Sequence, residues 1–400
     1  MKKKVTVIGT GMDGCDTITK KGSKAIENSQ LLIGADRILK PFEKLGKPCF
    51  HSYDAKKISE YISNCEYENI AVLMSGDCGF YSGALSLLPY LENYDTEVIS
   101  GISSPSYFCS KLGMGYGDMR FVSLHGKNEN IIRHIASNRK TFFLLGGSIS
   151  PKDICLRLCE YEMGDLTVHI GENLAIENEV IKSGKAKDFQ YADFGRLCVM
   201  IVENHNFERF LKSCIDDDEF VRGNVPMTKC EVRSVCVSKL MIGRNDVCWD
   251  IGCGTGSVSV EAAMRCPSGK VYAVEKNSDA VILTEKNRHK FRCDNIEIIL
   301  GEASSAVENL PAPDCVFIGG SGGKLENIVK TAVTKNPRAR IVVTSVSLET
   351  LEICLKTFGQ YGLLCNVTQI AVTRTNTVGN HTMLKAENPI FIIERSFKNE

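Results

Sequence analysis

Residues 245–256 read Asn-Asp-Val-Cys-Trp-Asp-Ile-Gly-Cys-Gly-Thr-Gly and decide the fold of the second half of the chain. An apolar run leads into Asp250, and glycine then falls at every second position, at Gly252, Gly254 and Gly256. Glycine permits a tight turn and a close approach of the backbone to a ligand, so the pattern predicts a buried parallel strand that ends in a ligand-binding loop. Glu275 ends the next apolar run, about 20 residues downstream, where a carboxylate can accept hydrogen bonds from both hydroxyls of a ribose. We therefore expect a nucleoside-binding α/β domain.

The composition is that of an ordinary globular protein. The chain has 400 residues, a length that predicts two or three domains. Its formal net charge is zero and 24% of its residues are charged, so the composition indicates neither nucleic acid nor an anionic membrane as a partner. The sequence has no apolar run of about 18 residues, the length that a transmembrane helix needs. The N-terminal apolar run is short and ends in glycine, as in a first β-strand rather than a signal peptide.

The 18 cysteines include no C-x-x-C pair, and several lie inside apolar runs, such as Cys198, Cys248 and Cys315. Cysteine in such a place behaves as a small hydrophobic residue. We therefore expect reduced core thiols in a cytoplasmic protein, with no metal site, rather than disulfides.

Apolar β-type runs alternate with helical stretches along the whole chain, which predicts an α/β architecture. The rhythm breaks at the acidic run Asp216–Glu219, interpreted as a solvated linker, and we place the junction near residue 215, between domains at 1–210 and 220–400. Strands are expected in the first half near 4–9, 70–75, 97–101, 141–146, 166–170 and 197–203. Strands are expected in the second half at 246–251, 270–275, 296–300, 314–319, 340–345, 365–372 and 389–395. No helix separates the last two, so a largely parallel sheet should end in an antiparallel hairpin.

The glycine spacing at 252–256 separates two classes of cofactor. A dinucleotide fingerprint reads G-x-G-x-x-G, whereas this stretch reads G-x-G-x-G after an aspartate. It resembles motif I of the class I S-adenosylmethionine-dependent methyltransferases, which have a Rossmann-like fold with a seven-stranded sheet. Gly301-Glu302-Ala303 resembles the adenine-contacting turn of that family. The cofactor-binding residues that the resemblance implies are Thr228, Asp250, Gly252, Cys253, Gly254, Thr255, Gly256, Glu275, Glu302 and Ala303.

Flanking motifs narrow this resemblance. Residues 225–233 precede the core, Gly-Gly-Ser-Gly-Gly at 319–323 follows the fourth strand, and Arg374 and Asn388-Pro389 lie near the end. Over residues 223–396 the chain resembles the decarboxylating precorrin-6B, or cobalt-precorrin-6B, C15-methyltransferases of cobalamin biosynthesis. A corrin precursor carries many carboxylates, and arginine suits bidentate pairing with them. The expected substrate-binding residues here are Gly319, Gly320, Ser321, Gly322, Gly323, Arg233 and Arg374. Arg374 and Glu231 are also catalytic candidates, although Glu231 can equally help to start a helix.

The N-terminus carries a different glycine pattern. Residues 9–14 read Gly-Thr-Gly-Met-Asp-Gly after an expected strand, and Asp36 follows near the acidic position of a dinucleotide site. Taken alone, this pattern predicts NAD binding. The stretch that follows it, however, looks like a loop that ends in a helix N-cap at Thr19 rather than a helix start.

Three further elements explain the first half better. Residues 76–83, 101–104 and 123–127 resemble, in that order, the class III tetrapyrrole methyltransferases, and within them the C5-methyltransferases acting on precorrin or cobalt-precorrin. The resemblance covers residues 3–205 and implies two αβα subdomains with S-adenosylmethionine in the cleft between them. The implied cofactor-binding residues are Asp77, Phe80, Ser103, Ser104 and Gly146, while Gly11 is expected to face the tetrapyrrole. His125 is the one histidine within a motif, and it is either structural or suited to proton transfer.

Together the halves resemble the fused precorrin-6Y C5,15-methyltransferase (decarboxylating) family. That resemblance implies a cytoplasmic enzyme that methylates C5 and C15 of a corrin precursor and decarboxylates its ring C acetate. It also implies S-adenosylmethionine as the cofactor and assembly into a homo-oligomer. Two alternatives remain at this point: an NAD-dependent tetrapyrrole reductase fused to one methyltransferase, and a catalytically silent tetrapyrrole-binding first half.

Overall fold

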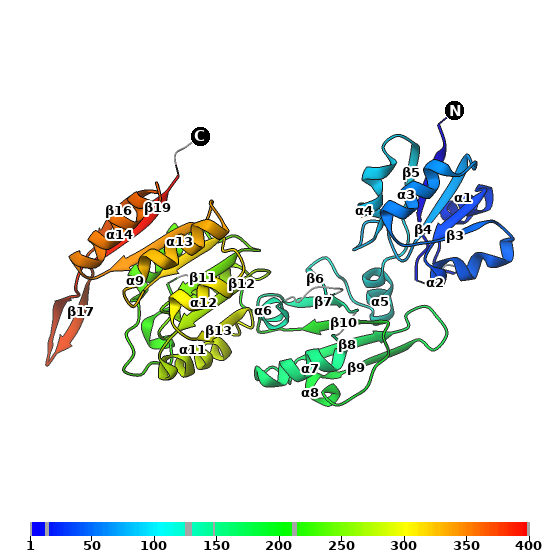
Figure 1. Ribbon diagram of the computed structural model, residues 1–400. Helices are drawn as coiled ribbons and strands as arrows, with labels where there is room; N and C mark the ends of the chain where they lie inside the picture. The colour runs from blue at the N-terminus through cyan, green and yellow to red at the C-terminus, as the bar shows by residue number, and fades with distance from the viewer. Residues whose placement is uncertain (1, 13–15, 125–129, 147–148, 210–213, 398–400) are drawn as a thin grey trace. The chain divides into compact units, whose positions relative to one another are not determined.

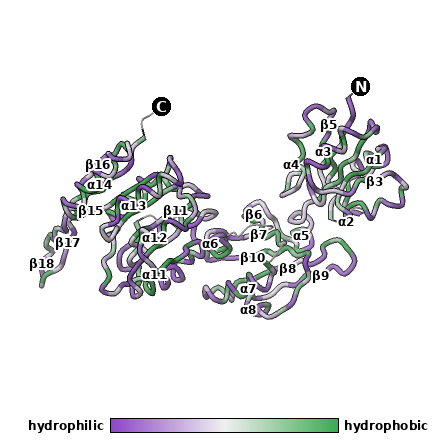
Figure 2. The backbone as a smooth tube through the Cα atoms, in the orientation of Figure 1, coloured by the Kyte–Doolittle hydropathy of each residue, from purple (hydrophilic) through white to green (hydrophobic). Residues whose placement is uncertain are grey.

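The computed structural model describes all residues except 1, 13–15, 125–129, 147–148, 210–213 and 398–400 (Figure 1). The chain divides into two compact units. Unit 1 holds residues 1–128 and 139–205, and unit 2 holds residues 129–138 and 206–400. Within each unit the hydrophobic segments run along the strands (Figure 2), in accord with strands that are buried inside sheets.

The first sheet of unit 1 is parallel and has the strand order β3-β2-β4-β1-β5. Strand β1 lies between β4 and β5 and is almost wholly buried, as its largely apolar sequence predicts. The strands are β1 (Lys4–Gly9), β2 (Leu31–Gly34), β3 (Cys49–His51), β4 (Asn69–Met74) and β5 (Asp95–Ile99). The accompanying helices are α1 (Lys20–Asn28), α2 (Asp36–Leu39), η1 (Lys40–Leu45), α3 (Ala55–Asn64), α4 (Ala84–Leu87), η2 (Leu88–Leu91) and α5 (Ser104–Leu112).

The second sheet of unit 1 is mixed, with the order β6-β7-β10-β8-β9 and only β6 and β7 parallel. Its strands are β6 (Met119–Ser123), β7 (Lys140–Leu144), β8 (Thr167–Glu172), β9 (Val180–Lys185) and β10 (Cys198–Glu203). Helices α7 (Pro151–Glu160) and α8 (Ala186–Phe189) belong to the same half of the unit. A capping box starts α7, because Ser150 and Asp153 each accept a hydrogen bond from the other's backbone N–H.

Unit 2 is built on a seven-stranded sheet with the order β13-β12-β11-β14-β15-β19-β16, and strand β19 runs antiparallel to both of its neighbours. Its strands are β11 (Val247–Ile251), β12 (Lys270–Glu275), β13 (Ile296–Leu300), β14 (Cys315–Ile318), β15 (Arg340–Ser345), β16 (Leu364–Ile370) and β19 (Ile390–Ser396). Its helices are α6 (Ile131–Ala136), η3 (Asp217–Glu219), α9 (Cys230–Lys239), α10 (Ser257–Arg265), α11 (Ser278–Lys290), α12 (Ala303–Asn309), α13 (Leu325–Lys335) and α14 (Leu348–Gln360).

Two features of unit 2 differ from the sequence-based expectation. The last two strands of the sheet are not joined by a simple hairpin, because β17 (Thr373–Val378) and β18 (His381–Ala386) form a separate two-stranded sheet between them. These strands are polar and almost entirely exposed, so they carry no apolar alternation to reveal them. Helix α6 also clusters with unit 2, where the Asp294 carboxylate accepts hydrogen bonds from the N–H groups of Ile132 and Arg133 at 2.8 and 3.0 Å.

Every cysteine in the described part of the chain is a free thiol, and most of them are buried. Within the same residues, the helices are too short or too polar to cross a membrane.

Candidate active sites

The glycine loop of unit 2 follows β11, and its three glycines at 252, 254 and 256 have φ angles of +72°, +58° and +74°. A Cβ atom on Gly252 would lie 2.6 Å from the backbone oxygen of Gly320. Strands β11 and β14 are parallel neighbours, with Ile251 paired to Ile318, so the loops that follow them meet at one edge of the sheet. Gly252 is therefore required both by its left-handed backbone and by the contact with Gly320.

Glu275, at the end of β12, is held by backbone groups. One carboxylate oxygen accepts a hydrogen bond from the N–H of Gly254 at 3.0 Å. The other accepts from the N–H groups of Lys276 and Asn277 at 2.8 and 3.0 Å. The side chain is half-buried and its orientation is set by three amides, which leaves further lone pairs for ribose hydroxyls.

Glu275 lies in the wall of a cavity of about 490 Å³. The cavity has the size typical of a small-molecule site. Gly252, Gly254, Glu302, Ala303 and residues 319–322, all expected from the sequence, also line it. Val225, Pro226 and Gly301 also line it and belong to the motifs at 225–233 and 301–303. The lining residues that no motif marks are Asn224, Val274, Lys276, Asn277 and Ala280.

A second cavity of about 490 Å³ adjoins the first. The two share Pro226, Gly252 and residues 319–322, so the glycine loops form a common floor. Some predicted residues line the second cavity but not the first, namely Thr228, Asp250, Cys253 and Gly323. Other residues of its wall are Met227, Val232, Phe317, Thr344, Ser345 and Val346. Two reactants can therefore lie side by side over a floor that is mostly glycine, which is the arrangement that group transfer needs.

Asp250 is 2% exposed and contributes a carboxyl to this second cavity. The hydroxyl of Ser259 donates to one of its oxygens, and the other oxygen has no hydrogen-bond partner. Burial raises the pKa of Asp250 to about 7, with a smaller contribution from the charge of Glu275.

Two predicted members of the glycine loop, Thr255 and Gly256, line neither cavity. Thr255 is fully buried, and Gly256 occupies the N-cap position of α10. A Cβ on Gly256 would lie 2.6 Å from the side chain of Thr284, so this glycine serves helix packing.

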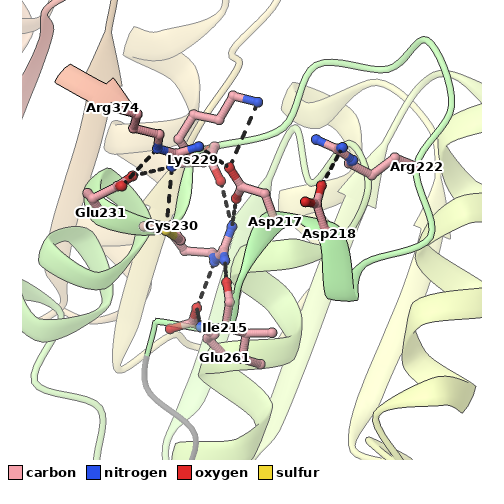
Figure 3. A network of polar contacts seen from close by, with 11 residues as sticks. Ile215, Asp217, Asp218, Arg222, Lys229, Cys230, Glu231, Glu261 and Arg374 are labelled. Carbon is pink, nitrogen blue, oxygen red and sulfur yellow. Dashed lines mark hydrogen bonds and ion pairs between the residues drawn. The ribbon is translucent and has the colours of Figure 1, made fainter. Parts of the chain in front are cut away.

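The position of Arg233 corrects an expectation from the sequence. Its side chain is 0% exposed, and its guanidinium donates to Glu261 at 2.7 Å, to Asp217 at 3.3 Å and to two backbone oxygens (Figure 3). No part of it is available to a substrate. Asp217 is likewise buried at 7% exposure, so the acidic run is not wholly a solvated linker. Arg233 fastens this segment to α9 and α10.

Arg374 lies in β17 and contacts Asp217, which is also a partner of Arg233 (Figure 3). It donates to Glu231 at 2.9 Å and to Asp217 at 3.2 Å, and 34% of its side chain is exposed. The hydrogen bond from Arg374 lowers the pKa of Glu231 to about 2, so this glutamate is ionised and paired. It also lies in the first turn of α9, in accord with the alternative of a helix-starting role.

Unit 1 has a cavity of about 300 Å³ whose wall combines the loop that follows β4 with residues of β6, β7, β8 and β10. Asp77, Phe80 and Ser104 of the predicted set line it. Asp77 joins two loops, because its oxygens accept from the N–H groups of Gly79 and Gly101 at 2.8 and 3.1 Å. Gly76, Tyr81 and Ser123 also line it and belong to the motifs at 76–83 and 123–127, and Met12 belongs to the glycine pattern at 9–14. The lining residues that no motif marks are Arg37, Ser75, Leu144, Leu145, Gly171, Asn173, Leu174, Ile176, Leu197, Cys198 and Val199.

The remaining predicted residues of unit 1 lie elsewhere. Ser103 is the N-cap of α5 and accepts from the N–H of Ser106 at 3.4 Å. Gly146 pairs with Ile149 in an isolated bridge and does not line the cavity. His125 lies outside the described residues.

The N-terminal glycine pattern does not form a dinucleotide site in this structure. Gly11 and Gly76 exchange two backbone hydrogen bonds, at 3.1 and 2.7 Å, so the N–H of Gly11 is already used. Helix α1 begins only at Lys20, after the N-cap Thr19 that the sequence indicated. A dinucleotide fingerprint instead opens a helix directly at its glycines.

The contact between Gly252 and Gly320 leads to a first prediction. We expect Gly252→Ala to lower the free energy of unfolding by about 2 kcal/mol or more, because it adds left-handed strain to a clash with backbone. Gly320→Ala is the matched control, since its Cβ would have no neighbour within 4 Å. Denaturant titration measures both, and equal losses would contradict the proposed contact.

A second prediction concerns the buried arginine. Arg233→Met should cost about 3–5 kcal/mol of unfolding free energy, because it removes the buried cation that Glu261 and Asp217 share. Two of the cations that stay, Arg265 at Glu261 and Arg374 at Asp217, lie 3.5 and 3.2 Å away and are partly exposed. Arg374→Met should cost about 1 kcal/mol or less, because its ion pairs are partly exposed. A substrate-binding Arg233 would give the opposite result in the same chemical denaturation experiment, namely unchanged stability.

A third prediction follows from the raised pKa of Asp250. A carboxyl with a pKa of about 7 in the folded state and an ordinary value of 3.8 favours folding when protonated. This stability is complete below the ordinary value and is lost as the pH rises through about 7. Asp250→Asn should therefore gain stability relative to the parent chain between pH 5 and pH 7, at up to about 1.4 kcal/mol per pH unit. Thermal unfolding across that range measures the difference, and a constant difference would refute the assignment.

Comparisons with known proteins match a methyltransferase family to each half of the chain. A family model described as "Precorrin methyltransferase domain" matches residues 218–395, and one described as "Tetrapyrrole (Corrin/Porphyrin) Methylases" matches residues 4–190. A probable cobalt-precorrin-6B C(15)-methyltransferase (decarboxylating) of Pyrobaculum calidifontis is 44% identical over 182 residues, which are 45% of this chain and 93% of the relative. The precorrin-6Y C(5,15)-methyltransferase (decarboxylating) of a Sinorhizobium species is 24% identical over 394 residues, 96% of this chain and 94% of the relative.

Among solved structures, the precorrin-6Y C5,15-methyltransferase of Geobacter metallireducens is 37% identical and covers 46% of this chain and 95% of its own, with a TM-score of 0.44. The match of one relative to nearly the whole chain, and of the C15-methyltransferases to unit 2, disfavours both alternatives to the methyltransferase fusion. The chain belongs to the decarboxylating precorrin methyltransferases, the S-adenosyl-L-methionine-dependent C-methyltransferases of cobalamin biosynthesis.

Proposed function

We propose that the chain carries two methyltransferase sites with separate tasks. Unit 1, a class III fold of two αβα subdomains, methylates C5 of a precorrin or cobalt-precorrin. Unit 2, a class I Rossmann-like fold, methylates C15 and decarboxylates the ring C acetate. The domains correspond to residues 1–210 and 220–400. The observation that carries the proposal is that each unit holds its own cavity at the loops that follow its parallel strands.

In unit 2 we assign S-adenosylmethionine to the first cavity. The cavity has room for the cofactor because residue 254 is glycine. A Cβ there would lie 3.0 Å from the backbone oxygen of Pro226 and would narrow the space that the loop leaves open. Glu275 would accept from the ribose, and Glu302 and Ala303 would lie at the adenine. The cofactor supplies an electrophilic methyl group. The chain orients it toward the second cavity and excludes water there.

The tetrapyrrole is assigned to the second cavity, over residues 319–323 and beside Thr228. With the cofactor bound, an enamine-like bridge carbon of the macrocycle would form the new bond to the methyl carbon; the bond from methyl to sulfur would break with its electron pair left on sulfur, and the macrocycle would release a proton. Loss of carbon dioxide breaks the bond from the acetate methylene to its carboxylate, and the macrocycle accepts the electron pair before a proton returns to that carbon. Arg374 remains a candidate partner for a substrate carboxylate because a third of its side chain is exposed.

In unit 1 we assign the cofactor to the cavity lined by Asp77, Phe80 and Ser104. Phe80 packs edge-on against Phe121 and Phe142, with ring centroids 5.4 and 6.0 Å away, which holds it in the wall. Asp77 is committed to the amides of two loops, so we assign it the role of shaping the cavity.

A fourth prediction tests the division of labour by mass spectrometry of the product made from precorrin-6B or cobalt-precorrin-6B. The parent chain should add two methyl groups and remove one carbon dioxide. Asp77→Ala should add one methyl group and still decarboxylate, because only the loops of unit 1 are disturbed. Gly254→Arg should add one methyl group without decarboxylation, because the long side chain enters the first cavity of unit 2.

Each variant serves as the control for the other. A folded Asp77→Ala chain that loses both methylations, or a Gly254→Arg chain that still decarboxylates, would show that the tasks are not divided in this way.

A further inference from the structure

Arg37 is a cation in the wall of the unit 1 cavity. It lies in α2, just after the carboxyl end of β2, at the edge of a parallel sheet where ligands usually bind. Its side chain is exposed, and its guanidinium donates to the hydroxyl of Ser75 at 3.3 Å. Neither the glycine loops nor the cofactor assignment uses it.

The charges around Arg37 leave it unneutralised. Among the described residues of this cavity wall, Arg37 is the one cation and Asp77 the one carboxylate. Both oxygens of Asp77 are occupied by backbone N–H groups. Asp36, the neighbour in sequence, instead pairs with His51, with 2.6 Å between the ring nitrogen and the carboxylate oxygen. Within the part of the chain that the structure describes, no carboxylate forms an ion pair with Arg37.

The rest of the wall has a different chemistry. Met12, Phe80 and Leu144 belong to an apolar cluster of unit 1, and all three also line the cavity. The cavity thus combines an apolar wall with a guanidinium at its edge. With the cofactor assigned to this cavity, the guanidinium at its edge fits a flat apolar ring that lies beside the cofactor and carries carboxylates at its periphery.

We propose that Arg37 binds a peripheral carboxylate of the tetrapyrrole and thereby sets the orientation of the macrocycle in unit 1. The inference rests on the proposed C5-methyltransferase function of this unit. Arginine presents a planar fork of donors that pairs with a carboxylate through two parallel hydrogen bonds, which a lysine cannot reproduce. The cofactor also carries a carboxylate, on its methionine part, so the test must distinguish the two.

The experiment compares the full chain with Arg37→Gln, Arg37→Lys and a control, Arg139→Gln, using cobalt-precorrin-6B and S-adenosylmethionine. Arg139 is an exposed arginine of the same unit that precedes β7, whereas the cavity is lined by Leu144 at the other end of that strand. The KM of the tetrapyrrole for C5 methylation should rise about tenfold to a hundredfold in Arg37→Gln, as expected for loss of a charged hydrogen bond.

Several readouts accompany that change. The KM of S-adenosylmethionine should stay the same, and Arg37→Lys should restore part of the tetrapyrrole affinity. The tetrapyrrole KM of the parent chain should rise with ionic strength more steeply than that of Arg37→Gln. An unchanged KM of S-adenosylmethionine for C5 methylation shows that unit 1 of each variant is folded, and methylation at C15 in the same samples shows the same for unit 2.

An unchanged tetrapyrrole KM in Arg37→Gln, or a rise confined to S-adenosylmethionine, would overturn the inference while leaving the C5 activity in place. An equal rise in Arg139→Gln would overturn it as well, since the effect would then be one of net charge. Absence of C5 methylation in the parent chain would instead refute the proposed function of unit 1, and the inference with it.

Discussion

The C-terminal site depends on one constraint, a close contact between two loops at residues that have no side chain. Gly252 and Gly320 follow parallel neighbouring strands, and a Cβ on Gly252 would lie 2.6 Å from the Gly320 oxygen. Because the loops can touch through backbone alone, they form one floor beneath two adjoining cavities. Unit 1 uses the same device, since a Cβ on Gly101 would lie 2.2 Å from the Gly76 oxygen. In both units the site is therefore an opening left by missing side chains at the carboxyl edge of a parallel sheet.

The charged residues mostly serve to hold these openings in shape. Glu275 and Asp77 are bound to backbone amides of their own loops, and Arg233 is enclosed by carboxylates and carbonyl oxygens. Burying a charged group without a partner costs free energy, so each of these groups must keep its hydrogen-bond partners. The segments that carry the group and its partners are therefore held together. Asp250 and Arg37 differ, because each keeps part of its polar surface uncommitted in a cavity wall.

Much of unit 2 was predictable because its signals are local. The apolar run into Asp250, the glycine spacing and the acid at the end of the next strand all describe a backbone geometry that neighbouring residues alone impose. Strands β17 and β18 were not predictable, since both of their faces are exposed and their apolar residues do not alternate. The N-terminal glycine pattern matches a dinucleotide fingerprint only in its spacing. The helix N-cap expected at Thr19 already indicated a loop, and the hydrogen bonds between Gly11 and Gly76 show the partner of that loop, which the sequence could not.

The sequence by itself determined the order of the motifs, the seven-stranded sheet and the class of cofactor, because glycine spacing and strand hydrophobicity act over a few residues. Only the tertiary structure decided which charged side chains are buried against protein partners and which are exposed. Arg233 and Arg374 look equivalent as candidates for a carboxylate substrate, yet one is 0% exposed and the other is 34% exposed. Their partners Asp217, Glu231 and Glu261 come from other elements of the fold. Whether an arginine meets a buried carboxylate or a ligand is settled by the packing of those elements, which local sequence does not encode.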